Sequence, residues 1–134
     1  MQYWNDESGL DGRVLQALMM ESLTAAENYT RLSRCFSGRQ AEALCRMARE
    51  SKAQGTCIAG ICALVAGEPP KKTTPLPDTG MVTARLKKAY GRAMHLLAAC
   101  EEYARDPEYG PVFQRLTIRQ QDHCRMILEI IGCL

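Results

Sequence analysis

Two pairs of polar residues have the spacing at which a helix presents two side chains on one face. Ser51 and Gln54 form one pair, and Gln120 and His123 form the other. Helical bundles use this i, i+3 spacing when a Glu-x-x-His pair serves a dinuclear metal centre. Serine and glutamine are neutral, however, and no Glu-x-x-His occurs anywhere in the chain. The spacing therefore indicates a site, whereas the residue types argue against an ordinary metal centre.

Glycine and proline divide the chain into four predicted helices, and its abundant Ala, Leu, Met, Glu and Arg favour helix over strand. Gly38 is expected to cap the first helix at its C-terminus. Thr79 or Asp78 is expected to cap the third helix at its N-terminus, and Pro107 suits the first position of the fourth. The predicted helices cover approximately residues 10–36, 40–66, 81–105 and 107–134.

The linker 67–80 contains four prolines, which exclude a helix there. At roughly 3.1 Å per extended residue it could cover about 40 Å, the length of a helix of about 26 residues. The short turns at 37–39 and 105–110 predict two antiparallel hairpins. The chain, residues 1–134, is thus predicted to be one all-α four-helix-bundle domain with a long Pro-rich crossover. The alternative is a loose surface loop in an up-and-down bundle.

Inward-facing apolar tracks follow all four predicted helices at alternating spacings of three and four residues. Their polar interruptions lie near the middle of the helices, where an antiparallel bundle brings them into one layer. Buried polar groups cost about 1–3 kcal/mol each unless they are paired, so this layer should be a hydrogen-bonded network or a site. Its predicted members are Ser22, Ser51, Gln54, Gln120 and His123.

Three helices resemble the rubrerythrin-like branch of the ferritin-like superfamily. Residues 46–61 are similar to the family pattern Ala-x-Glu-Glu-x-x-His-Ala, and residues 116–124 to Leu-Ala-x-x-Glu-x-x-His. Residues 21–32 resemble Glu-x-x-Ala-x-x-x-Tyr-x-x-Leu, with Tyr29 and Leu32 as anchors. The resemblance covers nearly the whole chain. It implies a ferritin-like fold and, in complete members, a di-iron centre that acts on peroxide or oxygen.

The ligand positions that this resemblance implies are degenerate. Only His123 keeps the family's ligand type, and Ala93, at the third-helix position, is the least securely placed. Carboxylates provide most of the oxygen ligands of a di-iron centre and neutralise the charge of divalent iron. An ordinary di-iron centre is therefore not expected, and no cofactor is predicted. Iron or manganese remains the alternative. The positions hold Ser22, Ser51, Gln54, Ala93, Gln120 and His123.

Glu21 and Glu50 each precede an emptied position by one residue, which places them about 100° around the helix from it. A shift of the frame by one residue would bring them inward but would also bury Arg46. Both glutamates are therefore predicted to lie on helix flanks, solvated or paired with arginine. A single-metal site of His123 with Glu50 or Glu21 is the alternative.

Tyr29 and Tyr90 are candidates to hydrogen-bond into the polar layer, and His95 is predicted to be structural or at the surface. The seven cysteines are odd in number and form no C-x-x-C pair, so neither a disulfide framework nor a zinc or rubredoxin-type site is indicated. They are expected to be small buried hydrophobes.

Composition narrows the function further. A net charge of +2 does not indicate nucleic-acid binding, and no apolar run reaches the roughly 18 residues that would span a membrane. Residues 1–11 lack a signal-peptide pattern, so a cytoplasmic protein is expected. The leading prediction is a ferritin-like protein that has lost its di-iron centre and acts as a binding or structural module, as a homodimer. The alternatives are a rubrerythrin-type oxidoreductase and a small-ligand pocket in the emptied site.

Overall fold

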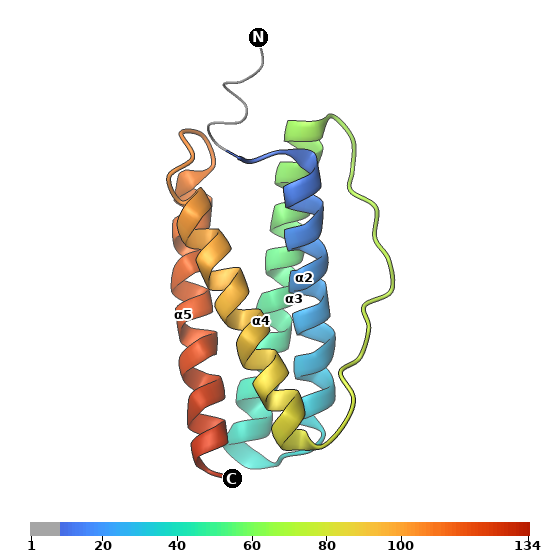
Figure 1. Ribbon diagram of the computed structural model, residues 1–134, viewed down its shortest axis with the longest axis vertical. Coiled ribbons are helices and arrows are strands. Elements are labelled where there is room, and N and C mark those ends of the chain that lie inside the picture. The colour runs from blue at the N-terminus through green and yellow to red at the C-terminus, as the bar shows by residue number, and fades with distance from the viewer. Residues whose placement is uncertain (1–8) are drawn as a thin grey trace.

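The computed structural model describes residues 9–134 and shows four α-helices with no strand in that range (Figure 1). The prediction of an all-helical chain with four helices is confirmed. Residues 1–8, which entered the signal-peptide prediction, lie outside the described range. The helices are α2 (Gly12–Ser33), α3 (Gly38–Ala66), α4 (Val82–Tyr103) and α5 (Gly110–Gly132).

The bounds of the first helix and the start of the second differ from the prediction. The carboxylate of Asp11 accepts a hydrogen bond from the Val14 amide at 2.9 Å and thereby caps α2, which already ends at Ser33. Gly38 does not cap α2; with φ of +59° it is the first residue of α3, where the chain turns back. A left-handed conformation of this kind favours glycine. At its other end α3 stops at Ala66, as predicted, and Gly67 with φ of +81° is its C-cap.

The third helix starts near Met81 as predicted, but its predicted N-cap and the predicted start of α5 are wrong. Neither Thr79 nor Asp78 is the N-cap of α4; that position is Met81. Pro107 lies before α5, because the carboxylate of Asp106 accepts hydrogen bonds from the next amides along the chain and holds them in a turn. The helix begins three residues later, with Pro111 in its first turn.

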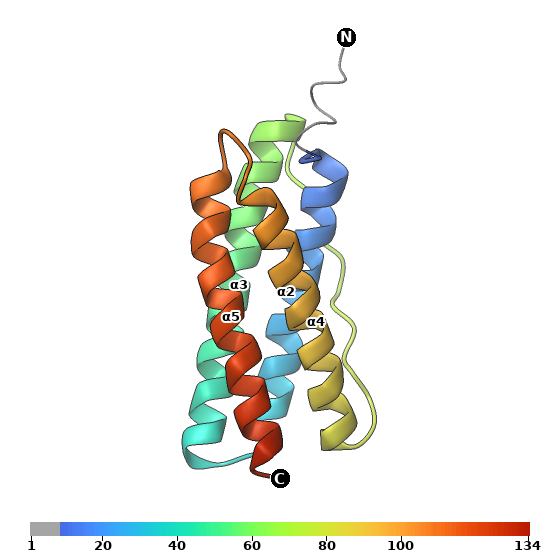
Figure 2. The ribbon, with the colours of Figure 1, turned by 60° about the vertical axis from the view of Figure 1, so that its left-hand side comes forward.

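The linker between α3 and α4 is held along the side of α2 (Figures 1 and 2). The Lys71 amide donates to the side chain of Gln16 near the start of α2. Towards the end of α2, Asn28 donates to the Leu76 carbonyl and accepts from the Asp78 amide at 2.7 Å. The linker therefore follows α2 in the same direction, and it is not a loose surface loop.

Apolar side chains from all four helices form the core. Leu15, Ile58, Leu86 and Phe113, one from each helix, are all fully buried. Burying a side chain of this size contributes about 1.5–3 kcal/mol, so the core dominates the stability of the bundle. None of the described helices is long and apolar enough to cross a membrane.

Candidate functional site

The predicted polar positions lie inside the bundle. Each is at most 1 % exposed, and none of them is a carboxylate. The buried positions are Ser22, Ser51, Gln54, Ala93, Gln120 and His123. The helical periodicity therefore placed these side chains on the interior faces correctly.

A chain of hydrogen bonds joins three of these side chains across three helices. Gln120 Nε2 on α5 donates to Gln54 Oε1 on α3 at 3.0 Å, and Gln54 Nε2 donates to Ser22 Oγ on α2 at 3.1 Å. Ser22 in turn donates to the Leu18 carbonyl oxygen. An amide group can both donate and accept, so Gln54 connects its two neighbours without any ion.

His123 lies at the inner edge of a second, charged group. Its Nε2 is 2.8 Å from Glu50 Oε1, and its ring makes an edge-on contact with the Tyr29 ring at a centroid distance of 5.7 Å. Burial lowers the pKa of His123 and outweighs the hydrogen bond to Glu50, which would raise it. A neutral ring beside an ionised carboxylate donates from Nε2, which leaves Nδ1 as an acceptor.

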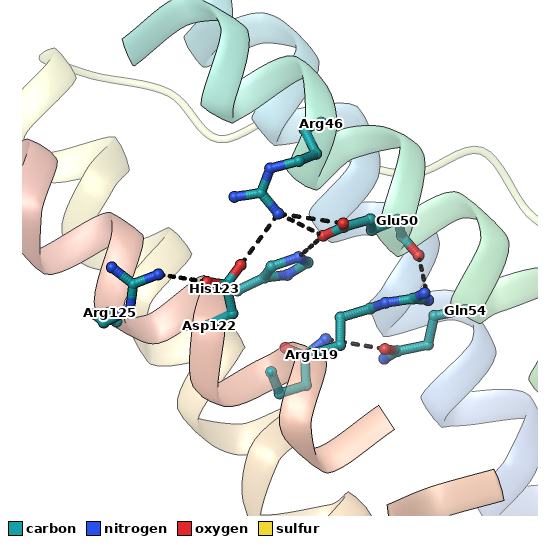
Figure 3. A network of polar contacts seen from close by, with 8 residues as sticks. Arg46, Glu50, Gln54, Arg119, Asp122, His123 and Arg125 are labelled. Atoms are coloured by element: carbon teal, nitrogen blue, oxygen red, sulfur yellow. Dashed lines mark hydrogen bonds and ion pairs between the residues drawn. The ribbon is translucent and has the colours of Figure 1, made fainter. Parts of the chain in front are cut away.

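Arg46 is the cation that lies between the two carboxylates of the charged group (Figure 3). Its Nη1 lies 3.1 Å from Glu50 Oε1 and 3.1 Å from Asp122 Oδ2. Burial alone would raise the pKa of both carboxyls, but hydrogen bonds outweigh it. Those from His123 and Arg46 lower the pKa of Glu50, and those from Arg125 and Arg46 lower the pKa of Asp122. Both carboxylates are therefore stabilised in their ionised form.

Glu50, Asp122 and His123 offer three ligand atoms that lie within 4.8 Å of one another, a spacing at which they could hold one metal ion. The sequence reasoning missed Asp122, whose only signal was its position next to His123. The prediction that Glu50 lies on a flank and pairs with arginine is confirmed. Glu21 is not part of this group; it contacts the exposed His95 at 2.6 Å.

The described residues do not fit a di-iron centre. The interior positions hold neutral serine and glutamine side chains, which hydrogen-bond to one another. The nearest carboxylates, on Glu50 and Asp122, already share the positive charge of Arg46. Two divalent irons need several carboxylates for charge neutralisation, and the interior layer provides none.

The two predicted tyrosines and the seven cysteines differ in how deeply they are buried. Tyr29 is fully buried against His123, and burial raises its pKa. Tyr90 is half-buried against the core and makes no hydrogen bond to the described part of the layer. Burial was expected of the cysteines, but four of the seven are exposed because they lie on solvent-facing sides of their segments. The exposed ones are Cys35, Cys45, Cys57 and Cys133.

A further polar group, also missed in the sequence, fastens the linker. The side chain of Asn28 is buried and bonds the linker backbone at two points. Asp78 in the linker forms a 2.8 Å ion pair with Arg92 on α4. Asn28 lies beside the predicted interior track of its helix, so only the presence of the linker explains its burial.

The surface pockets lie apart from the polar layer. One of about 460 Å³ lies between α2 and α3 and includes Leu23, Cys45 and Pro75. Another of about 600 Å³ lies where the start of α3 meets the end of α5 and includes Ser37 and Met126. Neither is lined by a residue of the layer, so neither corresponds to the predicted ligand pocket.

Comparison with models of known protein families found no match, and neither did comparisons with curated proteins or with solved structures. The functional inference therefore depends on the geometry of the chain itself.

Proposed function

We propose that this chain is a ferritin-like bundle that has lost a di-iron centre and serves as a binding or structural module. The observation that carries the proposal is the position of Arg46 between Glu50 and Asp122, 3.1 Å from a carboxylate oxygen of each. Its guanidinium group gives these carboxylates the positive charge that a metal ion would give them. The protein thus supplies its own cation.

The order of contacts along the helices supports a ferritin-like connection. Ser22 in α2 bonds Gln54 in α3. Gly12 in α2 lies close to Ala66 in α3, since a Cβ added to Gly12 would lie 2.8 Å from the Ala66 Cβ. Residue numbers therefore rise in opposite directions along the two helices. The linker then follows α2 to its far end, where α4 begins. A single long crossover between two antiparallel hairpins is the ferritin-like arrangement.

Metal analysis tests the loss of the centre. Protein loaded anaerobically with iron(II) or manganese(II) and then desalted is expected to retain no stoichiometric metal. The Arg46→Met variant keeps an unbranched side chain but removes the charge, so Glu50, His123 and Oδ2 of Asp122 become available, while Arg125 still contacts Oδ1. This variant is expected to bind about one divalent ion per chain, because three ligands and solvent complete a single-metal site.

Arg49→Met is the matched control, because Arg49 is an exposed arginine of the same helix. It is expected to behave as the unmodified protein does. Two metals bound per unmodified chain would contradict the proposal. Failure of the Arg46→Met variant to bind metal would show that Arg46 does not stand in for a metal ion.

A metal-dependent oxidoreductase of rubrerythrin type, acting on peroxide or oxygen, is the second candidate. The observation that favours it is the close group of Glu50, Asp122 and His123. It requires Arg46 to turn away into solvent, which its partly exposed side chain permits. Stoichiometric metal in the unmodified chain, together with peroxide consumption that the His123→Gln variant loses, would favour this candidate over the first.

A further inference from the structure

Three buried polar atoms of the layer have no hydrogen-bond partner within the described chain. They are Ser51 Oγ, Gln120 Oε1 and His123 Nδ1, and their residues are at most 1 % exposed. A buried polar atom without a partner costs about 1–3 kcal/mol. Such atoms are rare in folded proteins, and several in one layer point to a partner from outside the chain.

The contacts between α3 and α5 place the residues that carry these three atoms in one layer of the interior. The Glu50–His123 contact at 2.8 Å places Ser51, the next residue, level with His123. Gln120 lies one turn away from His123 on the same helix, so their side chains are neighbours. Ala25 of α2 and Ala93 of α4 are buried as well and carry only methyl groups, and none of the three atoms has a hydrogen-bond partner among the described residues.

The protonation of the neighbours defines the chemistry of the missing partner. Gln120 Oε1 accepts only, since the Nε2 of this residue is the atom that donates to Gln54. His123 Nδ1 is an acceptor because Nε2–H donates to Glu50. The hydroxyl of Ser51 can donate. A partner that donates twice and accepts once would satisfy all three atoms. A neutral molecule suits this place, because Glu50, the charged side chain that His123 contacts, is already paired with Arg46.

We propose that the layer binds one buried water molecule, which donates to Gln120 Oε1 and His123 Nδ1 and accepts from the Ser51 hydroxyl. Water is the smallest neutral molecule with two donors, and buried waters typically make about three hydrogen bonds. The inference rests on the metal-free layer of the proposed function. It adds that the layer, after the loss of carboxylates, is completed by solvent.

Nuclear magnetic resonance on the labelled full chain tests the proposal. Magnetisation transfer from water to the side-chain amide protons of Gln54 and Gln120 is expected. This transfer should have the sign that is typical of a water molecule bound for longer than nanoseconds. The Ser51→Val variant removes a hydrogen-bond partner and fills space, so this transfer should fall at least severalfold. Thr56→Val is the matched control on the exposed side of α3 and should leave the transfer unchanged.

The outcomes separate this inference from the proposed function. Slowly exchanging Gln54 and Gln120 amide protons without transfer from water would overturn the inference, whether or not the Ser51→Val variant folds. A saturable shift of these signals on adding formamide, which also donates twice and accepts once, would replace water with an organic ligand. A large shift of the His123 Nδ1 signal on adding iron(II) would instead overturn the metal-free layer itself.

Discussion

Gln54 is the residue on which the neutral part of the layer depends. Its amide oxygen accepts from Gln120 and its amide nitrogen donates to Ser22, so one side chain joins three helices. A carboxylate at this position could accept but could not donate, and it would bring a charge into the core. The residue is therefore suited to a bundle that holds its centre together with hydrogen bonds.

Replacing Gln54 with leucine should lower the free energy of unfolding by about 1–3 kcal/mol, because the Gln120 amide loses its buried acceptor. Urea denaturation followed by circular dichroism measures the change. Gln121→Leu at an exposed position of α5 is the control and should shift stability by less than about 0.5 kcal/mol.

The double variant Gln54→Leu, Gln120→Leu sharpens this prediction. Replacing both partners with apolar groups removes the unsatisfied amide, so the double variant should recover part of the lost stability. A double variant whose loss of stability equals the sum of the two single losses would show that the two amides do not depend on each other.

At the scale of elements, the linker is fixed by side chains rather than by its own conformation. Asn28 holds its backbone against α2, and the Asp78–Arg92 ion pair holds it against α4. Both side chains of this pair are largely shielded from solvent, so they are less screened than surface pairs. These contacts set where the crossover ends and α4 begins.

Asn28→Ala should release the linker. The Leu76 carbonyl and the Asp78 amide would lose their partner, and trypsin should then cleave after Lys71 or Lys72 several times faster than in the unmodified protein. Stability should fall by about 1–2 kcal/mol. Thr74→Ala, a change in an exposed linker residue, provides the control for altered linker sequence. Equal cleavage rates would show that Asn28 does not hold the linker.

At the scale of the whole molecule, the hydrogen bonds between α3 and α5 all involve polar or charged side chains within the described chain (Figure 3). Three of the four contacts depend on charge: Arg46 with Asp122, Glu50 with His123, and Arg119 with the Glu50 carbonyl. Two of the contacts between α3 and α5, Arg46 with Asp122 and Glu50 with His123, therefore respond to pH.

Acid should weaken the bundle in two stages. The pKa of His123 in the folded chain lies below 6.5, so the unfolded chain binds more protons as the pH falls below that value. The lowered pKa values of Glu50 and Asp122 extend the loss of stability below about pH 4.5. Each proton bound in excess by the unfolded chain costs up to about 1.4 kcal/mol per pH unit.

Unfolding measured between pH 8 and pH 4 tests this. The groups that face His123 are Glu50, Asp122, Arg46 and Tyr29, of which only the carboxyls titrate in acid. His123→Gln should remove the stage that begins near pH 6.5 and leave the stage below pH 4.5. An unchanged pH profile in this variant would mean that another group causes the first stage.

The sequence by itself determined the four helices and the side chains that face the interior, because helical periodicity is a property of neighbouring residues. It therefore placed Ser22, Gln54 and His123 in the core without knowledge of the fold. Only the tertiary structure decided that Arg46 reaches Asp122, that Asn28 is covered by the linker, and that Gly38 starts a helix instead of ending one. These features depend on long side chains and turns meeting across helices, which no spacing within one helix specifies.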